Sequence, residues 1–262
     1  MKRLVIDTCF AACSVALINC ERRAAALELM QRGHAEALMP MIRRVMNEAE
    51  SGFSDLDEII VTSGPGTFTG MRVGIAAARA LSLAAGVGLV GLGTLQLMAW
   101  GALRQLQEKA RRQSSKAMAS KAMAHDIMTA ADPVSAVPAP AIAVAVDARK
   151  NQIYFQLFDN QGEAMSVAQV ISPGDALQAL PQGRVVALGN GAMALAHALK
   201  TAPPAIAAAI KVQTELPDLQ PDARDLGLRP LAAADRAQVV KPLYLRPPDA
   251  KPQTGKRIAR VR

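Results

Sequence analysis

Residues 59–81 constrain the fold of this chain more than any other stretch. Residues 59–63 form an apolar run of strand length, and the glycine-rich residues 64–70 join it to an alanine-rich segment with helical composition. Glycine permits backbone angles that a Cβ forbids, and Thr67 or Thr69 can cap the helix that follows. The pattern predicts a strand, a loop and a helix in succession, with backbone amides that could attract an anion at the helix start.

Several common functions of glycine loops do not fit these residues. No Lys-Ser or Lys-Thr pair follows the last glycine, as a P-loop requires, and the spacing departs from G-x-G-x-x-G. Ser63 lacks the preceding Gly-x of a hydrolase nucleophile elbow. Two interpretations stay open: an anion site, or a glycine turn that only makes a corner between strand and helix.

Composition places the chain among globular proteins with a substantial core. Its 262 residues are 51% hydrophobic, which suffices for one large domain or two small ones. Asp7 interrupts the apolar stretch near the start, so we interpret that stretch as part of a cytoplasmic protein and not as a secretion signal. No later run reaches the apolar length of a membrane span.

Cysteines and histidines do not form a pattern typical of a metal site. The cysteines lack C-x-x-C spacing, and we expect buried reduced thiols at Cys9, Cys13 and Cys20. The histidines are too far apart for a helix-borne zinc pair, since they stand at His34, His125 and His197. We therefore predict no metal in this chain.

The formal charge of +8 is concentrated in two segments. Residues 101–125 hold six basic residues and one acidic residue, and residues 249–262 hold five and one. Such clusters can neutralise nucleic-acid phosphates, but they are also typical of a solvated basic surface. Aromatic residues are only 3% of the chain, so we expect no platform on which bases would stack.

The sequence contains two weakly similar halves. In each, an apolar strand ends in an aspartate, Asp7 or Asp147, and a second strand follows. Later in each half a strand runs through a glycine turn into a helix, at 59–81 and at 185–199. The duplication predicts an α/β fold of two ribonuclease-H-like domains, the architecture of actin, sugar kinases and heat-shock ATPases.

Composition changes set the expected domain boundaries. Residues 105–140 are rich in Ala, Ser, Lys, Met and Pro and contain a tandem Ser-Lys-Ala-Met-Ala copy, so we interpret them as a low-complexity insert with some helix. The expected units are a first domain at 1–104, this insert, a second domain at 141–248 and a basic flexible tail at 249–262.

Five sequence blocks together carry a specific resemblance. They are Val5-Ile-Asp-Thr8 with Cys13-Ser-Val-Ala-Leu17, His34-Ala-Glu-Ala-Leu-Met-Pro-Met-Ile42, Gly64-Pro-Gly-Thr-Phe-Thr-Gly-Met-Arg-Val-Gly74, Asp147-Ala-Arg-Lys-Asn-Gln-Ile-Tyr154 and Pro242-Leu-Tyr-Leu-Arg246. In these blocks the chain resembles the bacterial YeaZ family, also called TsaB, of the machinery that puts threonylcarbamoyl on tRNA adenosine. They cover most of the chain outside 105–140.

The resemblance implies a non-catalytic subunit. YeaZ proteins resemble inactive relatives of the catalytic subunit TsaD, and they bind TsaD in a complex that also includes the ATPase TsaE and takes tRNA as its substrate. We expect no cofactor on the chain alone, ATP and magnesium at the level of the complex, and no membrane contact. A homodimer through the same helices is a further expectation.

The resemblance also implies which residues form the sites. The partner interface is expected on the first two long helices, at Leu38, Met41, Ile42, Met46, Arg72, Val73, Gly74, Ala77, Ala78 and Leu81. The loop is Gly64, Pro65, Gly66, Thr67, Phe68, Thr69 and Gly70, and a vestigial cleft holds Asp7 and Asp147. The chain lacks histidines at 92–97, where TsaD has metal ligands, and Gly227 and Pro230 interrupt a segment that is usually helical in the family.

Two enzyme hypotheses compete with the non-catalytic one. An ATP-hydrolysing or phosphoryl-transferring enzyme of the same architecture would use Asp7, Asp147 and the Gly64 loop. A glycoprotease, an activity attached to the family by name, would need a trio such as His34, Asp7 and Ser63, for which the sequence offers no specific support.

Overall fold

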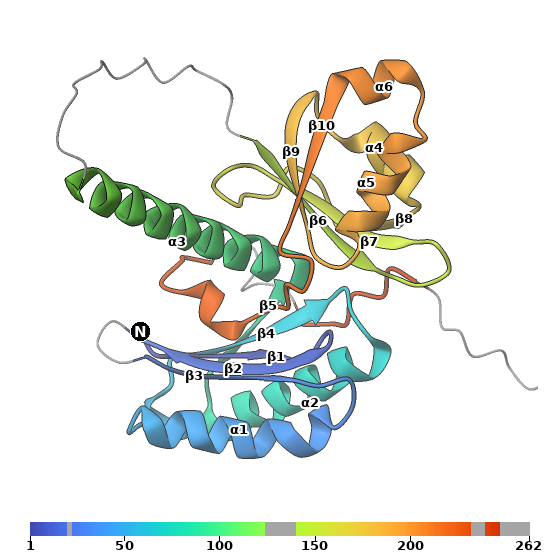
Figure 1. Cartoon of the computed structure of the whole chain (residues 1–262). Helices are drawn as coiled ribbons and strands as arrows, with labels where there is room; N and C mark the ends of the chain where they lie inside the picture. Colours follow the sequence, from blue (N-terminus) through green and yellow to red (C-terminus); the bar gives the residue numbers. More distant parts are fainter. Residues whose placement is uncertain (20–22, 124–139, 232–238, 247–262) are drawn as a thin grey trace, which may run out of the picture.

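Buried apolar strands form the centre of two five-stranded sheets (Figure 1). The computed structural model describes residues 1–19, 23–123, 140–231 and 239–246. The first sheet consists of β1 (Arg3–Asp7), β2 (Ala12–Ile18), β3 (Arg23–Leu29), β4 (Glu58–Gly64) and β5 (Gly88–Gly93), in the order β3-β2-β1-β4-β5. β1, β2 and β3 pair antiparallel, while β4 pairs parallel with β1 and with β5.

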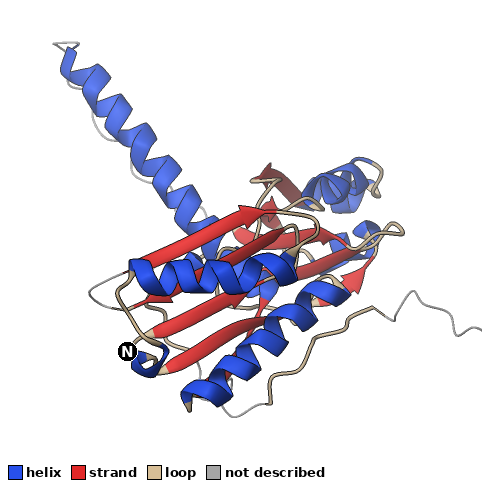
Figure 2. Ribbon diagram, turned by 90° about the horizontal axis from the view of Figure 1, so that it is seen from below, coloured by secondary structure: helices blue, strands red, loops and turns tan. Residues whose placement is uncertain are grey.

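The central strand β1 is covered on both faces. Every one of its residues is 5% exposed or less, which explains its continuous apolar run. On one face lie α1 (His34–Glu48) and α2 (Phe68–Ala85), which Figure 2 shows crossing the sheet. Apolar residues at helical spacing bury the inner side of α1, at Leu38, Met41, Ile42, Val45 and Met46.

The second sheet repeats the topology of the first. Its strands are β6 (Ala141–Asp147), β7 (Ile153–Phe158), β8 (Gln169–Ile171), β9 (Gly183–Leu188) and β10 (Ile210–Glu215), in the order β10-β9-β6-β7-β8. Again three strands pair antiparallel and two are added in parallel. The helices of this half are α4 (Pro173–Ala179), α5 (Ala192–Lys200) and α6 (Pro204–Ala209). The duplicated topology confirms the predicted α/β class with two related domains.

The long helix α3 (Thr94–Met123) begins between the two sheets. Leu97 and Trp100 join the core of the first half, and Leu95 and Met98 join the core of the second. From Gln107 onward the described side chains are exposed, and the helix projects from the body (Figures 1 and 2). The expected insert is thus helical up to residue 123, and residues 124–139 lie outside the described part.

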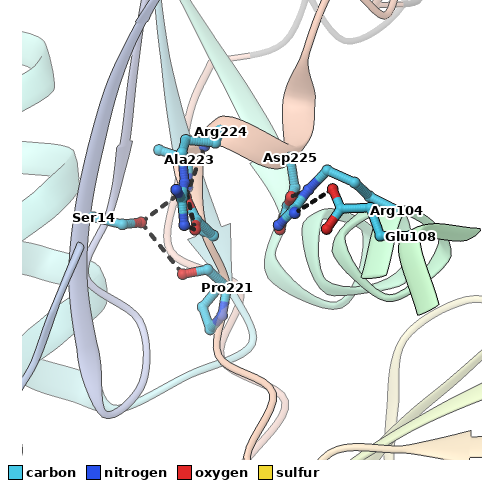
Figure 3. Close-up of polar contacts among 8 residues, drawn as sticks. Ser14, Arg104, Glu108, Pro221, Ala223, Arg224 and Asp225 are labelled. Atoms are coloured by element: carbon cyan, nitrogen blue, oxygen red, sulfur yellow. Dashed lines mark hydrogen bonds and ion pairs between the residues drawn. The ribbon is translucent and has the colours of Figure 1, made fainter. Parts of the chain in front are cut away.

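The C-terminal segment returns to the first half. After β10 a short helical turn, η2 (Ala223–Leu226), packs between the first sheet and α3 (Figure 3). Ser14 on β2 donates to the carbonyl of Pro221 at 3.3 Å and accepts the amide of Ala223 at 3.0 Å. Part of the expected second domain, 141–248, therefore belongs to the core of the first.

An ion pair fixes the other side of this turn. Arg104 of α3 donates to Asp225 at 2.6 Å and also contacts Glu108 at 3.2 Å (Figure 3). Burial raises the pKa of Asp225 to about 6, although the guanidinium opposes that shift. The turn ends at Gly227, which agrees with the interruption expected from the sequence.

None of the helices in the described ranges combines the length and apolar character needed to cross a bilayer. Cys9 and Cys13 are free and buried, as expected, and Cys20 lies outside the described residues. Burial raises the pKa of the Cys9 thiol far above its usual value and that of Cys13 to about 12, so both stay protonated at neutral pH.

Candidate functional site

The glycine loop closes against the end of β1. The amide of Thr67 donates to the carbonyl of Cys9 at 2.8 Å, and Thr8 donates to the carbonyl of Gly70 at 2.7 Å. Thr67 caps α2, because its hydroxyl accepts the amide of Gly70 at 3.1 Å. Three amides that could face an anion, those of residues 67, 70 and 71, thus donate within the chain.

Two glycines of the loop are required by this close approach. A Cβ at Gly66 would lie 2.7 Å from the carbonyl oxygen of Cys9, and one at Gly70 would overlap the carbonyl oxygen of Thr8. Backbone of the chain itself occupies the space next to these glycines. This geometry favours the corner over the anion site among the two interpretations of the loop.

Asp7 is sealed beneath the loop. Its side chain is 0% exposed, and its carboxylate accepts hydrogen bonds from the hydroxyl of Thr62 at 2.5 Å and the amide of Cys9 at 3.4 Å. Burial raises the pKa of Asp7 to about 7, against the opposing effect of these hydrogen bonds. A carboxyl in this position braces the strand end and has no surface with which to reach a ligand.

Asp147 occupies the corresponding place in the second half but is exposed. One of its carboxylate oxygens accepts the amide of Arg149 at 2.9 Å, and its own amide donates to Asn190 at 2.8 Å. The structure therefore does not present Asp7 and Asp147 to a common cleft, as the phosphoryl-transfer hypothesis requires.

The glycoprotease trio is not assembled either. His34 contacts the carbonyl of Phe10 at 3.0 Å, and Ser63 donates to the carbonyl of Leu92 at 3.4 Å. Asp7 is engaged with Thr62. Each of the three nominated groups thus has a different, structural partner. Among the described residues, no three His, Cys, Asp or Glu side chains are grouped to hold a metal ion.

Most of the residues expected at the partner interface are buried in the chain's own core. This holds for Leu38, Met41, Ile42, Met46, Gly74 and Ala78. They form the inner faces of α1 and α2 and cover the first sheet, so they cannot touch a partner while the domain is folded. Val73, Ala77 and Leu81 are half-buried, and Arg72 is exposed.

The site predicted from the sequence did not include the C-terminal segment, which contacts the glycine loop. The amide of Leu243 donates to the carbonyl of Ser63 at 2.7 Å, at the end of β4. Tyr244 stacks on Phe68 with ring centroids 5.3 Å apart and accepts a hydrogen bond from Arg72 at 2.7 Å. The block 242–246 was visible in the sequence, but nothing in its composition indicated that it lies on the glycine loop.

Comparisons with known proteins agree with this architecture. A family model described as "TsaD: tRNA N6-adenosine threonylcarbamoyltransferase" matches residues 28–112. The tRNA threonylcarbamoyladenosine biosynthesis protein TsaB of Escherichia coli is 39% identical over 105 residues, which are 40% of this chain. That match spans only 46% of the relative, less than half of its length.

Longer matches extend the likeness to both halves. The Haemophilus influenzae protein of the same name is 27% identical over 199 residues, which cover 72% of this chain and 71% of the relative. The solved structure named YeaZ from Pseudomonas aeruginosa superposes with a TM-score of 0.65 at 26% identity, covering 86% of this chain and 88% of that one. In its duplicated sheet topology and in these matches, the chain is similar to proteins named YeaZ and TsaB over both halves.

Proposed function

We propose that this chain is a non-catalytic subunit of the machinery that forms N6-threonylcarbamoyladenosine in tRNA, and that it acts by binding the catalytic threonylcarbamoyltransferase subunit. The names of its relatives support the pathway, since several are tRNA threonylcarbamoyladenosine biosynthesis proteins TsaB. The match of residues 28–112 to the TsaD family model supports a partner of similar fold.

The observation that carries the binding role is an apolar stripe on the outer side of α2. Leu83 is 86% exposed and is the largest side chain of this stripe. Small or apolar side chains continue from it at helical spacing, and the stripe consists of Val73, Ala76, Ala77, Ala80, Leu83 and Ala84. Small side chains let a second helix approach closely.

α1 adds to the same side of the domain. Met39 is 40% exposed there, and a methionine adapts to an irregular partner surface. This outer surface replaces the buried residues of the sequence-based interface. A homodimer through the same stripe, and entry of the ATPase subunit TsaE into the complex, belong to this proposal. ATP and magnesium are expected in the assembled complex only.

The non-catalytic part of the proposal is supported by the state of Asp7. A phosphoryl-transfer enzyme of this architecture needs a strand-end carboxylate that meets its ligand, whereas Asp7 is buried and hydrogen-bonded to Thr62. tRNA is proposed as the substrate of the complex, which this chain could help to steer through the exposed basic side of α3 at Arg111 and Arg112.

The test is binding to the cognate catalytic subunit. Leu83→Glu places a charge on the largest side chain of the stripe, near its C-terminal end and away from the core, and we expect the affinity for that subunit to fall by at least about tenfold. Isothermal titration calorimetry of the two purified subunits measures this directly.

A matched control separates the stripe from a general effect of charge. Met193 on α5 is 61% exposed in the second domain, and Met193→Glu should leave the affinity unchanged. Equal affinities for wild type and Leu83→Glu would refute the stripe as the interface. Absence of any complex with the wild-type chain would refute the proposed function as a whole.

A further inference from the structure

Aromatic side chains gather around one cavity of this aromatic-poor chain. The sequence has five phenylalanines, two tyrosines and one tryptophan. Four of these eight residues line a cavity of about 390 Å³, namely Phe10, Phe68, Tyr154 and Tyr244. Its volume falls in the range of small-molecule sites, which are mostly apolar and often lie between domains.

The cavity is built by segments from both halves of the chain. Phe10 follows β1 and lies 6.1 Å from Tyr154 of β7, measured between ring centroids. Phe68 at the start of α2 stacks on Tyr244 of the C-terminal segment. The glycine loop, the turn after β6 and residues 243–246 thus converge here, and each lies within one of the blocks that carry the family resemblance.

The polar part of the lining is charged. Arg149 and Arg246 line the cavity together with Asp147, so its charged side chains sum to a net positive charge. Asp147 accepts the amide of Arg149, and Arg246 donates to the carbonyl of Ala148. The first contact fixes the backbone of Arg149 and the second fixes the guanidinium of Arg246, and both residues line a largely apolar space together with Asp147.

The turn that carries Arg149 has a costly backbone conformation. Arg149, Lys150 and Asn151 all have left-handed angles, with φ values of 64°, 52° and 57°. Residues with a Cβ rarely adopt this conformation, and such outliers cluster at ligand sites. The turn is therefore a second feature, besides the aromatic lining, that marks this part of the molecule.

We propose that the cavity binds a small molecule that combines a planar aromatic ring with a negatively charged group. The ring would lie among the four aromatic side chains, where stacked and edge-to-face contacts are favourable. The negative group would face Arg149 and Arg246, whose guanidinium groups form charge-assisted hydrogen bonds with carboxylate or phosphate oxygens. This proposal is independent of the proposed function, because the cavity lies on the isolated chain.

Probes that share the naphthalene ring system and differ in charge test the proposal. They are 2-naphthoate, 2-naphthylmethanol and 2-naphthylmethylammonium, with acetate as an anion that has no ring. We expect the naphthoate to bind at least about tenfold more tightly than the neutral alcohol, since a hydrogen bond to a charged group contributes about a factor of ten or more. The ammonium compound should bind still more weakly, and acetate should not bind measurably.

The position of the bound probe is determined by NMR of methionine methyl groups in the full-length chain. Met71 lines the cavity, whereas Met193 is exposed on α5 in the second domain. With ¹³C-labelled methionine methyl groups, naphthoate should shift the Met71 resonance and leave that of Met193 in place. Shifts elsewhere with Met71 unchanged would overturn the proposal without the use of any variant.

Two arginine variants test the charge. Arg149→Asn removes the guanidinium while Asn tolerates the left-handed angle, and we expect the naphthoate affinity to fall about tenfold or more. Arg184→Asn on β9, an exposed arginine outside the cavity, is the control and should bind as the wild type does. The proposal fails if the wild type does not bind naphthoate, if all three naphthyl probes bind equally, or if the two variants behave alike.

Discussion

Replacing Asp7 by asparagine tests whether this carboxyl is a sealed structural group. In the folded chain its pKa is about 7, against an ordinary value of 3.8. A raised pKa means that the folded state holds its proton more tightly than the unfolded state does. The resulting stability is fully present below pH 4, and it is lost as the pH rises through 7.

The magnitude follows from the size of the shift. Between pH 5 and pH 8 the wild type should lose about 3 kcal/mol of unfolding free energy through Asp7, because each of the roughly two pKa units above pH 5 corresponds to about 1.4 kcal/mol. Asp7→Asn cannot ionise, so it avoids this loss. Its fixed cost, from the altered contacts with Thr62 and Cys9, does not depend on pH.

Urea denaturation at several pH values measures this effect. The unfolding free energy of Asp7→Asn minus that of the wild type should rise by about 3 kcal/mol from pH 5 to pH 8. Other titrating groups, including Asp225, are shared by the two proteins and cancel in the difference. A constant difference would show that Asp7 is ionised at pH 5 and solvated, and the argument for a sealed carboxyl would be wrong.

Three further changes test other parts of the structure. Ala78→Glu should destabilise the domain by several kcal/mol, because Ala78 is 0% exposed and the new carboxylate would be buried. Ala80→Glu, on the exposed side of the same helix, should change the stability by only about 0.5 kcal/mol. Equal melting temperatures of the two variants would contradict the orientation of α2. Ser14→Ala should lower the unfolding free energy by about 1 to 3 kcal/mol, since it leaves the carbonyl of Pro221 and the amide of Ala223 without their partner. An unchanged midpoint in urea denaturation would contradict the docking of the C-terminal segment. Changing both Arg111 and Arg112 to glutamine should weaken tRNA binding and reduce the slope of log affinity against log salt concentration by up to about 2. Arg184→Gln should leave that slope unchanged. An unchanged slope in the double variant would exclude these arginines of α3 from tRNA contact.

The fold was largely predictable from the sequence. The apolar runs that became β1, β4 and β6 are covered on both faces, so each appears in the sequence as a continuous stretch between turn residues. The duplicated aspartate and glycine-turn pattern indicated two domains of one topology. What the pattern did not indicate is that residues 221–231 return to the first domain, because an irregular segment has no periodicity from which its contacts can be inferred.

Which side of α1 and α2 is exposed was predicted less well, for a physical reason. Helical periodicity identifies the apolar side of α1 and α2. In a helix that covers a sheet, this side is buried in the chain's own core. Ala78 and Ala80 look alike in the sequence, yet one is buried and the other exposed. The aromatic cavity was missed for a similar reason, since Phe68 and Tyr244 are 176 residues apart and meet only through the C-terminal segment.

The most direct test of the central claim is a reconstituted tRNA modification assay with the cognate catalytic subunit, the ATPase subunit and this chain. The account predicts that threonylcarbamoyladenosine formation depends on the chain, survives Asp7→Asn under conditions where that variant is folded, and drops with Leu83→Glu in proportion to the lost complex. Full activity with Leu83→Glu combined with loss of activity in folded Asp7→Asn would contradict it, because the chain would then act through its own carboxylate and not through its outer helix.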